Sequence, residues 1–370
     1  MMLFLCGDVM TGRGVDQILP HPGDRALWEG YVRDAHEYVA LAESAHGPIP
    51  RPVPPSWPWG DTLPRLEQFR PDARIINLET SVTDRGVPAP GKGIHYRMHP
   101  ANIACLTAAR PSVVSLANNH VLDFGTQGLA DTLDGLSAVG IQTAGAGPDA
   151  SSAQQPAVVP VDGGRRVVVF AAGTRDSGIP SGWAATGDRA GVRLLPDLSS
   201  RTAAEVGAQV QRVKRRGDVV VFTVHWRPNW GYHVDDEQVR FAHDLVERGV
   251  DVVHGHSSHH PRPIEIYHGK LILYGCGDFI DDYEGIGGHE QYRSDLHVMY
   301  LPSIDPDSGR LARLTMIPLQ AQRMRLRATT GPDTTWLGSL LDRISRPFHT
   351  RIDRTDQHTL EAVPDGNPPE

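Results

Sequence analysis

Short apolar runs that end in polar residues recur along the chain, and they constrain its fold more than any other feature. Each run is rich in β-branched or aliphatic residues and is bounded by glycine or polar side chains, which is typical of a buried strand. The runs span residues 3–6, 74–76, 112–116, 219–224, 251–253 and 271–274. They predict sheets whose strands are covered on both faces.

Helical patterns lie between these runs. Apolar residues recur at helical spacing over residues 128–139, 202–216 and 236–248, and Gly249 suits the C-terminal cap of the last of these. Residues 331–346 form a further amphipathic pattern, which Pro347 stops. Strands that alternate with helices predict an α/β fold with largely parallel pairing.

Composition narrows the class of protein. The formal charge is −8, hydrophobic residues make up 39% of the 370 residues and charged residues 22%, which is ordinary for a soluble globular chain. The acidic balance argues against nucleic-acid binding and against binding to anionic membranes. The three cysteines, Cys6, Cys105 and Cys276, are too far apart for a CxxC site and indicate buried thiols in a reduced compartment.

The ends of the chain suggest a soluble, cytoplasmic protein. No apolar run approaches the roughly 18 residues of a membrane helix, and the N-terminus lacks the basic region of a signal peptide. We expect one domain over residues 1–330 with an insertion rich in proline and tryptophan at about 20–60, which is either a lid beside the site or plain surface packing. Residues 331–370 are expected to form a C-terminal helix followed by a polar, frayed tail.

Polar side chains with metal-binding chemistry follow the predicted strands, at or just beyond the point where each strand ends. These residues are Asp8, Glu79, Asn119, His120, His225 and His256. Carboxyl ends of strands gather at one edge of an α/β sheet, so these side chains are predicted to converge. Carboxylate, amide and imidazole ligands together suit Mn, Fe or Zn, and their number suggests two ions bridged by hydroxide.

The strongest single signal is a cluster of four histidines within seven residues, 254–260, at the end of a predicted strand. A solvated loop would not explain why these histidines follow directly after an apolar strand. The other motifs are weaker taken alone: Asp8 and Glu79 also fit turns, and His225 also fits a core histidine. Their common order along the chain is more informative than any one of them.

Six motifs together carry a resemblance to a known family. They are Gly7-Asp8-Val9-Met10 with Gly12-Arg13, Asn77-Leu78-Glu79, Ala117-Asn118-Asn119-His120 with Asp123 and Gly125, His225-Trp226, Gly255-His256 with His259, and Tyr274-Gly275-Cys276-Gly277-Asp278-Phe279. With these motifs, over residues 2–320, the chain resembles the CapA-type poly-γ-glutamate capsule biosynthesis proteins, relatives of the calcineurin-like metallophosphatases.

The resemblance implies a four-layer α/β/β/α sandwich of two mixed sheets flanked by helices, with metal ions at the strand ends. By similarity Asp8 would bridge two ions, Glu79 would be an acidic ligand and Asn119 an amide ligand. His120 matches the general acid of the phosphatases, and Asp123 or Asp278 would orient it. The remaining imidazole ligands would be His225, His256 and His259.

The chain also departs from the related patterns. Met10 stands where the phosphatases have a metal-binding histidine, and Asp278 stands where the capsule proteins usually have asparagine, which adds an anionic ligand or a base partner. Arg227, which follows His225-Trp226, is interpreted either as a clamp for an anionic substrate or as a surface arginine. Arg13 is a weaker candidate for a similar clamp.

Three functions follow from the sequence, and they stay open at this point. The first is a metal-dependent, phosphoesterase-like hydrolase in which a metal-activated hydroxide attacks an anionic small molecule or polymer. The second is a γ-glutamyl amide hydrolase or transferase at the same site; the absence of a GxxxxGK[ST] pattern argues against ATP-driven ligation. The third is a non-catalytic accessory protein of a polymer-synthesis complex. The oligomeric state is not specified.

Overall fold

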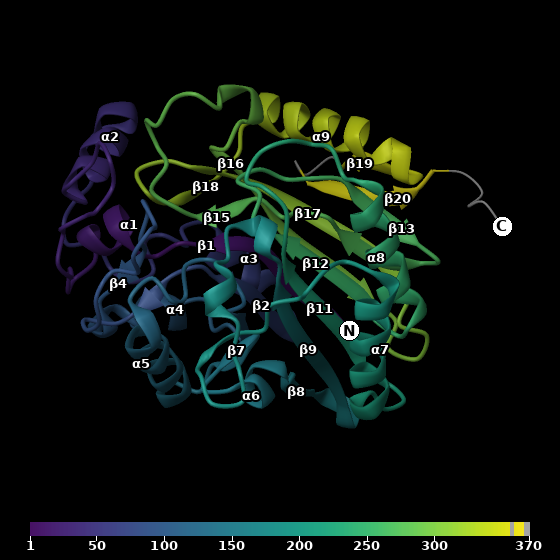
Figure 1. Cartoon of the computed structure of the whole chain (residues 1–370). Helices are drawn as coiled ribbons and strands as arrows, with labels where there is room; N and C mark the ends of the chain where they lie inside the picture. The colour runs from purple at the N-terminus through teal and green to yellow at the C-terminus, as the bar shows by residue number, and fades with distance from the viewer. Residues whose placement is uncertain (356–358, 366–370) are drawn as a thin grey trace.

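The structure, a computed structural model, describes residues 1–355 and 359–365. Two sheets face each other, and helices cover their outer faces (Figure 1). One apolar core lies between the sheets, a second between the first sheet and its helices, and a third between the second sheet and its helices. The protein is therefore the four-layer α/β/β/α sandwich that the sequence predicts.

The first sheet is mixed. Its order is β19-β20-β17-β16-β1-β2-β5-β6, and β15 pairs with β1 and β18 with β17. The strands from β1 to β6 are parallel, whereas those on the other side of β1 are antiparallel. The bounds are β1 (Leu3–Val9), β2 (Ala73–Leu78), β5 (Val113–Ser115), β6 (Gln142–Ala144), β15 (Asp278–Ile280), β16 (Leu296–Ile304), β17 (Leu311–Ala321), β18 (Leu326–Ala328), β19 (Thr350–Arg354) and β20 (Leu360–Pro364).

The second sheet has a parallel centre with an antiparallel strand at each edge. Its order is β13-β14-β12-β11-β9-β8. The bounds are β8 (Ala157–Val161), β9 (Arg165–Gly173), β11 (Val219–His225), β12 (Val252–His256), β13 (Ile264–Tyr267) and β14 (Lys270–Leu273). Two small sheets pair β3 (Ser81–Val82) with β4 (Arg97–Met98) and β7 (Ala146–Gly147) with β10 (Gly191–Val192).

Helices cover the outer faces, except that α9 packs its apolar face against the core between the sheets, and the predicted helices form close to their expected bounds. Ser199 and Asp235 cap the N-termini of α7 and α8 by accepting a hydrogen bond from a backbone N–H three residues later. The helices are α1 (Arg13–Ile18), α2 (His36–His46), α3 (Thr62–Phe69), α4 (Ala104–Thr107), α5 (Gly125–Ala138), α6 (Ala150–Gln154), α7 (Ser200–Val213), α8 (Asp236–Glu247) and α9 (Gly331–Ser345).

Alternation along β1 shows how the apolar runs build the layers. Leu3 and Leu5 are buried in the core between the two sheets, whereas Phe4 and Cys6 point to the core under the outer helices. A strand covered on both faces must be apolar at every position, which explains why the runs are continuous. All three cysteines are buried free thiols, as predicted.

The expectation of a frayed tail after the C-terminal helix is wrong for most of the described residues. Beyond α9, β19 and β20 pair with each other, and β20 pairs with β17, which extends the first sheet. Ile352 and Leu360 bury their side chains in the core between the sheets together with the apolar face of α9. Residues 356–358 and 366–370 of the predicted tail lie outside the described residues.

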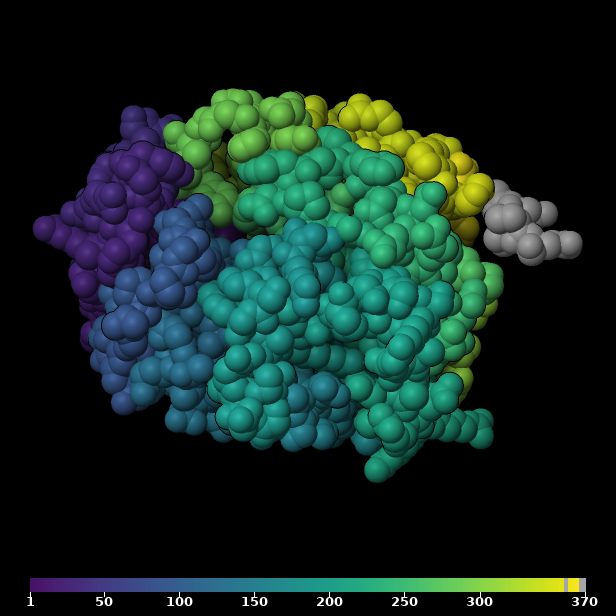
Figure 2. All heavy atoms as spheres, in the orientation of Figure 1, coloured from purple at the N-terminus to yellow at the C-terminus, as the bar shows by residue number. Residues whose placement is uncertain are grey.

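The predicted insertion at 20–60 packs against the first sheet's side of the molecule. Buried Glu29 accepts a hydrogen bond from Arg13 at 2.9 Å, and α2 contacts α1. Figure 2 shows this N-terminal segment in purple and the C-terminal helix in yellow at opposite ends of the visible face. No residue of 20–60 lines the 320 Å³ cavity described below, whereas His46 lines the second cavity, and the role of the insertion as a lid or as surface packing stays a prediction. The domain boundary near residue 330 stays a prediction.

Candidate metal centre

The first sheet brings its polar side chains together through the register of its parallel strands. In β1 and β2, Asp8 lies opposite Asn77, and Glu79 follows the end of β2. Asn119 and His120 follow β5, the next strand of the sheet. All these residues therefore lie at one edge, as the carboxyl ends of parallel strands require.

The second sheet brings the histidines to the same place. His225 ends β11 and His256 ends β12, and the two lie directly opposite each other in the parallel register. Their Nδ1 atoms are 2.8 Å apart. His259 comes three residues after β12 and contacts Asp278, with 2.9 Å between His259 Nδ1 and Asp278 Oδ1.

Where the two edges meet, two groups of three side chains have geometry suited to a metal ion, and Asp8 belongs to both. One group is Asp8, His225 and His256, and the other is Asp8, His259 and Asp278; within each, one ligand atom per residue lies within 4.8 Å of the others. All five residues are buried. Burying so many metal-ligating groups without a cation is costly, so their grouping could hold metal ions, and the predicted number of two stays a prediction.

Unpartnered atoms show that these residues fit divalent ions. His256 Nε2 and Asp278 Oδ2 are buried and have no hydrogen-bond partner. A buried polar atom without a partner costs about 1–3 kcal/mol. A bound ion beside Asp8 and His259 would satisfy Asp278 Oδ2, whereas the His256 nitrogen that faces Asp8 and His225 is Nδ1. Carboxylate and imidazole together suit Mn, Fe or Zn.

The carboxylates are held in a network that leaves them short of positive charge. Asn77 Nδ2 donates to Asp8 Oδ1 at 2.8 Å and to Glu79 Oε2 at 3.2 Å, and the backbone N–H of Ser257 donates to Asp8 Oδ2 at 3.2 Å. Burial raises the pKa of Asp8 to about 6, and burial together with the charge of Asp8 raises the pKa of Glu79. A divalent cation would reverse both shifts.

The histidines, by contrast, are held neutral. Burial lowers the pKa of His225, His256 and His259, and the neighbouring imidazoles lower the first two further. A neutral imidazole offers a lone pair, which is the form that binds a metal ion. The site therefore combines ionisable oxygens from one sheet with neutral nitrogens from the other.

Glu79 and Asn119 lie beside these groups rather than within them. Glu79 Oε1 is 3.8 Å from His225 Nε2 and 3.8 Å from His120 Nε2, while Asn119 Oδ1 is 3.0 Å from His225 Nε2. The structure thus brings all six predicted ligands into one cluster and adds Asp278. Their binding of a metal stays a prediction.

His120 and Asp123 form a hydrogen-bonded pair at the wall of the same cavity. His120 Nδ1 is 2.6 Å from Asp123 Oδ2, so its Nε2 faces Glu79 and the cluster. Burial is the largest cause that lowers the pKa of His120 to about 4, although Asp123 opposes it. His120 is therefore neutral at pH 7, with a proton on Nδ1 and a lone pair on Nε2.

Sequence reasoning missed Lys92. Its ammonium donates to Asp123 Oδ1 at 2.5 Å and to the backbone carbonyl of Asn119, and it lies 3.4 Å from His120 Nδ1. Gly91 and Gly93 flank it in a loop far from Asp123 in the sequence, so only the pairing of glycines around a lone lysine was available as a signal. The cavity has a volume of 320 Å³ and is lined by Glu79, Lys92, Gly93, Ile94, Asn119, His120, His225, Asn229, Ser257, His259 and Tyr283.

The two arginines considered as anion clamps are engaged elsewhere. Arg227 is paired with Asp176 at 2.7 Å, with Asp235 at 3.0 Å and with Glu237 at 2.8 Å, and it does not line the cavity. Arg13 is buried and paired with Asp282 and Glu29. Because both guanidinium groups already have carboxylate partners, the structure favours a structural role for each.

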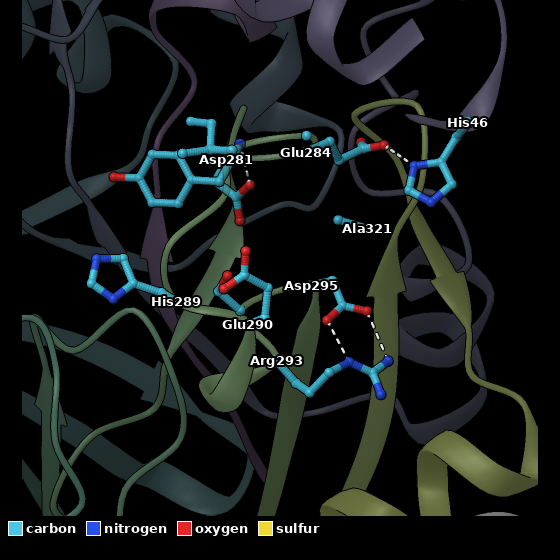
Figure 3. Close-up of a pocket in the computed structure, with 12 residues that line it drawn as sticks. His46, Asp281, Glu284, His289, Glu290, Arg293, Asp295 and Ala321 are labelled. Atoms are coloured by element: carbon cyan, nitrogen blue, oxygen red, sulfur yellow. Dashed lines mark hydrogen bonds and ion pairs between the residues drawn. The ribbon is translucent and has the colours of Figure 1, made fainter. Parts of the chain in front are cut away.

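A second cavity of 210 Å³ lies behind Tyr283, which lines both cavities. Figure 3 shows its acidic side chains, among them Asp281, Glu284 and Asp295. Glu284 accepts from His46 Nδ1 at 2.6 Å, and Asp295 accepts from Arg293 Nε at 2.7 Å. This cavity is acidic, but partners neutralise much of it.

Fold and site together define a four-layer α/β/β/α sandwich with a buried carboxylate and histidine cluster at the seam of its sheets. A family model described as bacterial capsule synthesis protein PGA_cap matches residues 2–283, and the chain belongs to this family.

Named relatives agree with this family. The probable polyglutamine synthesis accessory protein of Mycobacterium tuberculosis is 53% identical over 366 residues, which cover 99% of this chain and 96% of that protein. The PGA biosynthesis protein CapA of Bacillus subtilis is 30% identical over 282 residues, 75% of this chain and 62% of its own length. A solved structure of TT1561 from Thermus thermophilus is 9% identical, with a TM-score of 0.37 over 84% of this chain and 96% of its own. In the described part of the chain, none of the helices has the length and apolar character of a membrane span.

Proposed function

We propose that the protein is a metal-dependent hydrolase, phosphoesterase-like in its chemistry, that acts on an anionic substrate. One observation carries the proposal. Two groups of buried metal-ligating side chains share Asp8, and His225 and His259 from these groups line the same cavity as His120, which Asp123 contacts. When bound, two divalent ions would supply an acidified water as the nucleophile and offset negative charge on the substrate.

The chain's own residues position both the ions and the substrate. Asp8 would touch both ions, because it belongs to both groups. Asn77 fixes one of its oxygens and the Ser257 N–H fixes the other, so the carboxylate is preoriented before anything binds. Glu79 and Asn119 would complete the ligand set from the first sheet.

His120 would act as the general acid that donates a proton to the leaving group. Asp123 accepts from His120 Nδ1 and so directs Nε2 into the cavity. In the free protein Nε2 carries no proton at pH 7, since burial depresses the pKa of His120 to about 4. An anionic substrate beside Nε2 would raise that pKa. Substrate binding would therefore favour protonation of His120 Nε2, which is the form that acts as the general acid.

Lys92 supports an anionic substrate. It is the one ammonium group among the side chains that line the cavity, and Asp123 and the Asn119 carbonyl hold it at the wall. A phosphate or carboxylate placed in the cavity would lie beside this charge. Lys92 thus takes the role that the sequence had suggested for Arg227.

The second candidate reaction is hydrolysis or transfer of a γ-glutamyl amide. Two relatives, named PGA biosynthesis protein and polyglutamine synthesis accessory protein, favour it. The same site would serve, because ions that polarise a phosphoryl oxygen also polarise an amide carbonyl. A role as an accessory protein without catalysis is the third.

Parallel release assays separate these functions. We would offer p-nitrophenyl phosphate esters and γ-glutamyl p-nitroanilide to the protein loaded with Mn²⁺, and to the same protein treated with a chelator. Release from the esters that depends on Mn²⁺ and disappears in His120→Ala would support the phosphoesterase; release from the anilide alone would favour the amide reaction. Bound ions with no release from either substrate would overturn the hydrolase proposal and leave the accessory role.

A cytoplasmic location is part of this proposal. The three cysteines are buried and free, without a disulfide between them, as expected for a chain that folds in a reducing compartment. Fractionation of cells that express the full chain would test it. Recovery outside the cytoplasm would contradict this part of the proposal only.

A further inference from the structure

We infer that Asp278 is a direct ligand of one metal ion and takes the place of the histidine that the phosphatases have at the position of Met10. The inference rests on the proposed metal centre but not on hydrolysis. It assigns Asp8, His259 and Asp278 to one ion and Asp8, His225 and His256 to the other.

Met10 leaves the site short of one ligand. Its side chain is fully buried, and its sulfur accepts a weak hydrogen bond from the Tyr283 hydroxyl at 3.7 Å. The Tyr283 ring in turn packs edge-on against His259, with 5.1 Å between ring centroids. A thioether is a soft and weak ligand, so it would contribute little to an ion held by carboxylate and imidazole.

Strand pairing places Asp278 where the missing ligand is needed. Strand β15 begins at Asp278 and runs parallel to β1, with Asp278 directly opposite Asp8. The backbone N–H of Asp8 donates to the Gly277 carbonyl at 3.1 Å. This close approach requires glycine at position 7, because a Cβ there would lie 1.6 Å from the Gly277 oxygen. The two carboxylates are therefore fixed side by side by backbone geometry.

The hydrogen bonds of His259 direct its Nδ1 toward the same point. The side-chain amide of Asn229 lies 2.8 Å from His259 Nε2, while His259 Nδ1 lies 2.9 Å from Asp278 Oδ1 and faces that carboxylate. Asp278 offers more than the one oxygen that His259 contacts. Its Oδ2 is buried without any partner, although the side chain is completely enclosed. If Asp278 only oriented His259 through its other oxygen, nothing would offset the free-energy cost of burying Oδ2 without a partner.

The exchange alters the chemistry of this position. An anionic oxygen replaces a neutral nitrogen, so the ion here is bound by two carboxylates and one imidazole, whereas the other is bound by one carboxylate and two imidazoles. Oxygen ligands favour harder ions such as Mn²⁺, and nitrogen ligands favour Zn²⁺. The two positions should therefore differ in their preference for the two ions.

Calorimetric titration with Mn²⁺ alone, checked by elemental mass spectrometry after desalting, would test the inference. The wild type should bind two equivalents and Asp278→Asn one. Asparagine at position 278 keeps the shape of the side chain and an oxygen beside His259, but it removes the negative charge and the carboxylate ligand. Because burial raises the pKa of Asp278, removing its charge should not threaten the fold of the metal-free protein, which a thermal melt would confirm.

Double variants identify which ion is lost. His259→Ala should also bind one equivalent, and Asp278→Asn/His259→Ala should still bind one, because both changes remove the same ion. Asp278→Asn/His225→Ala should bind none. Asp281→Asn is the matched control: it makes the same change of charge three residues away, outside both groups, and should keep two equivalents.

Two equivalents bound by Asp278→Asn would overturn the inference, as would two equivalents bound by His259→Ala. Restoration of the second equivalent in Met10→His/Asp278→Asn, with a higher ratio of Zn²⁺ to Mn²⁺ affinity than in the wild type, would support it. These measurements do not depend on turnover. A protein that bound two ions as described but hydrolysed no substrate would refute the proposed function and leave this inference intact.

Discussion

Two acidic regions lie on either side of Tyr283, and only one of them has the character of a metal centre. In the cavity of Figure 3, His46 lies against Glu284, and Arg293 lies against Asp295. At the seam of the two sheets, Asp8, Glu79 and Asp278 lie within one buried cluster, whose nearest side-chain ammonium, that of Lys92, is bonded to Asp123.

The difference shows that acidity alone does not make a metal site. Both regions contain several carboxylates, but in the second cavity the chain places His46 against Glu284 and the Arg293 guanidinium group against Asp295. In the other the partners are neutral histidines and amides, so charge balance needs an ion from outside. The changes below test this contrast, from the largest expected effect to the smallest.

Removing a histidine should matter at the seam and not in the second cavity. We expect His120→Ala to lower turnover about 10²–10⁴-fold, because the proton at the leaving group loses its carrier. His46→Ala, which removes the partner of Glu284, should leave turnover unchanged. Steady-state kinetics on the substrate found by the release assays would check both, and equal losses in the two variants would contradict the contrast.

Metal ions should stabilise the fold, and Asp8 is the residue on which the binding of both ions depends. At a free Mn²⁺ concentration a hundredfold above Kd, each ion should add about 2.7 kcal/mol to the free energy of unfolding. Asp8→Asn should abolish this gain, since Asp8 belongs to both groups. Asp295→Asn should keep it. Urea unfolding with and without Mn²⁺ would measure the gain, and its survival in Asp8→Asn would place the ions elsewhere.

Metal affinity should fall in acid. Burial raises the pKa of Asp8 from 3.8 to about 6, so below pH 6 an ion must displace a proton from this carboxyl group. We expect the affinity for Mn²⁺ to drop about tenfold for each pH unit below 6, and to level off above it unless Glu79, whose pKa is also raised, adds a second step. Titrations between pH 5 and 8 would show this; a flat profile would mean that Asp8 is not a ligand.

Lys92 should affect substrate binding more than the chemical step. We expect Lys92→Met to raise KM for the anionic substrate about tenfold, on the order of 1.4 kcal/mol, with a smaller change in kcat. Lys270→Met is the control, because Lys270 pairs with Asp251 away from the cavity. A fall in kcat with KM unchanged would instead assign Lys92 to positioning Asp123.

The smallest effect is expected in the second cavity. Arg293→Gln removes the ion pairs with Asp295 and Asp333, which are partly exposed to water. Such pairs contribute about 0.2–1 kcal/mol, so the loss of stability should fall in that range. The number of Mn²⁺ ions bound should stay the same. An extra ion in this variant would show that Arg293 alone had kept the second cavity from binding metal.

Most of the secondary structure could be predicted from the sequence because its causes are local. Apolar runs with a polar end became β1, β2, β5, β11, β12 and β14, and helical periodicity became α5, α7, α8 and α9. The prediction for the tail failed for a physical reason as well. Strand β19 is short and rich in charge, and it is held by pairing with β20 and by packing against α9, while β20 in turn pairs with β17.

In the candidate site, too, some features were determined by the sequence and others only by the tertiary structure. Which residues would stand at the ends of strands, Asp8, His225 and His256 among them, was determined by the sequence by itself, because a strand ends where its apolar run ends. That β11 and β12 carry their histidines to the edge where β1 carries Asp8 was decided only when the two sheets packed face to face. This packing buries apolar surface between residues far apart in the chain, and no local pattern records it.

Lys92 shows the limit most clearly, whereas Asp278 was predicted from the sequence as an anionic ligand or a base partner, and only its position opposite Asp8 came from the structure. Lys92 reaches Asp123 through a loop, and Asp278 reaches Asp8 through a parallel strand pair that joins residues 270 positions apart. Arg227 looked like the anion-binding residue because it follows His225, yet three carboxylates from the folded chain already neutralise it. Sequence determined which charges the protein has, whereas the tertiary structure decided which of them are left without a partner, since that depends on the neighbours each one meets after folding.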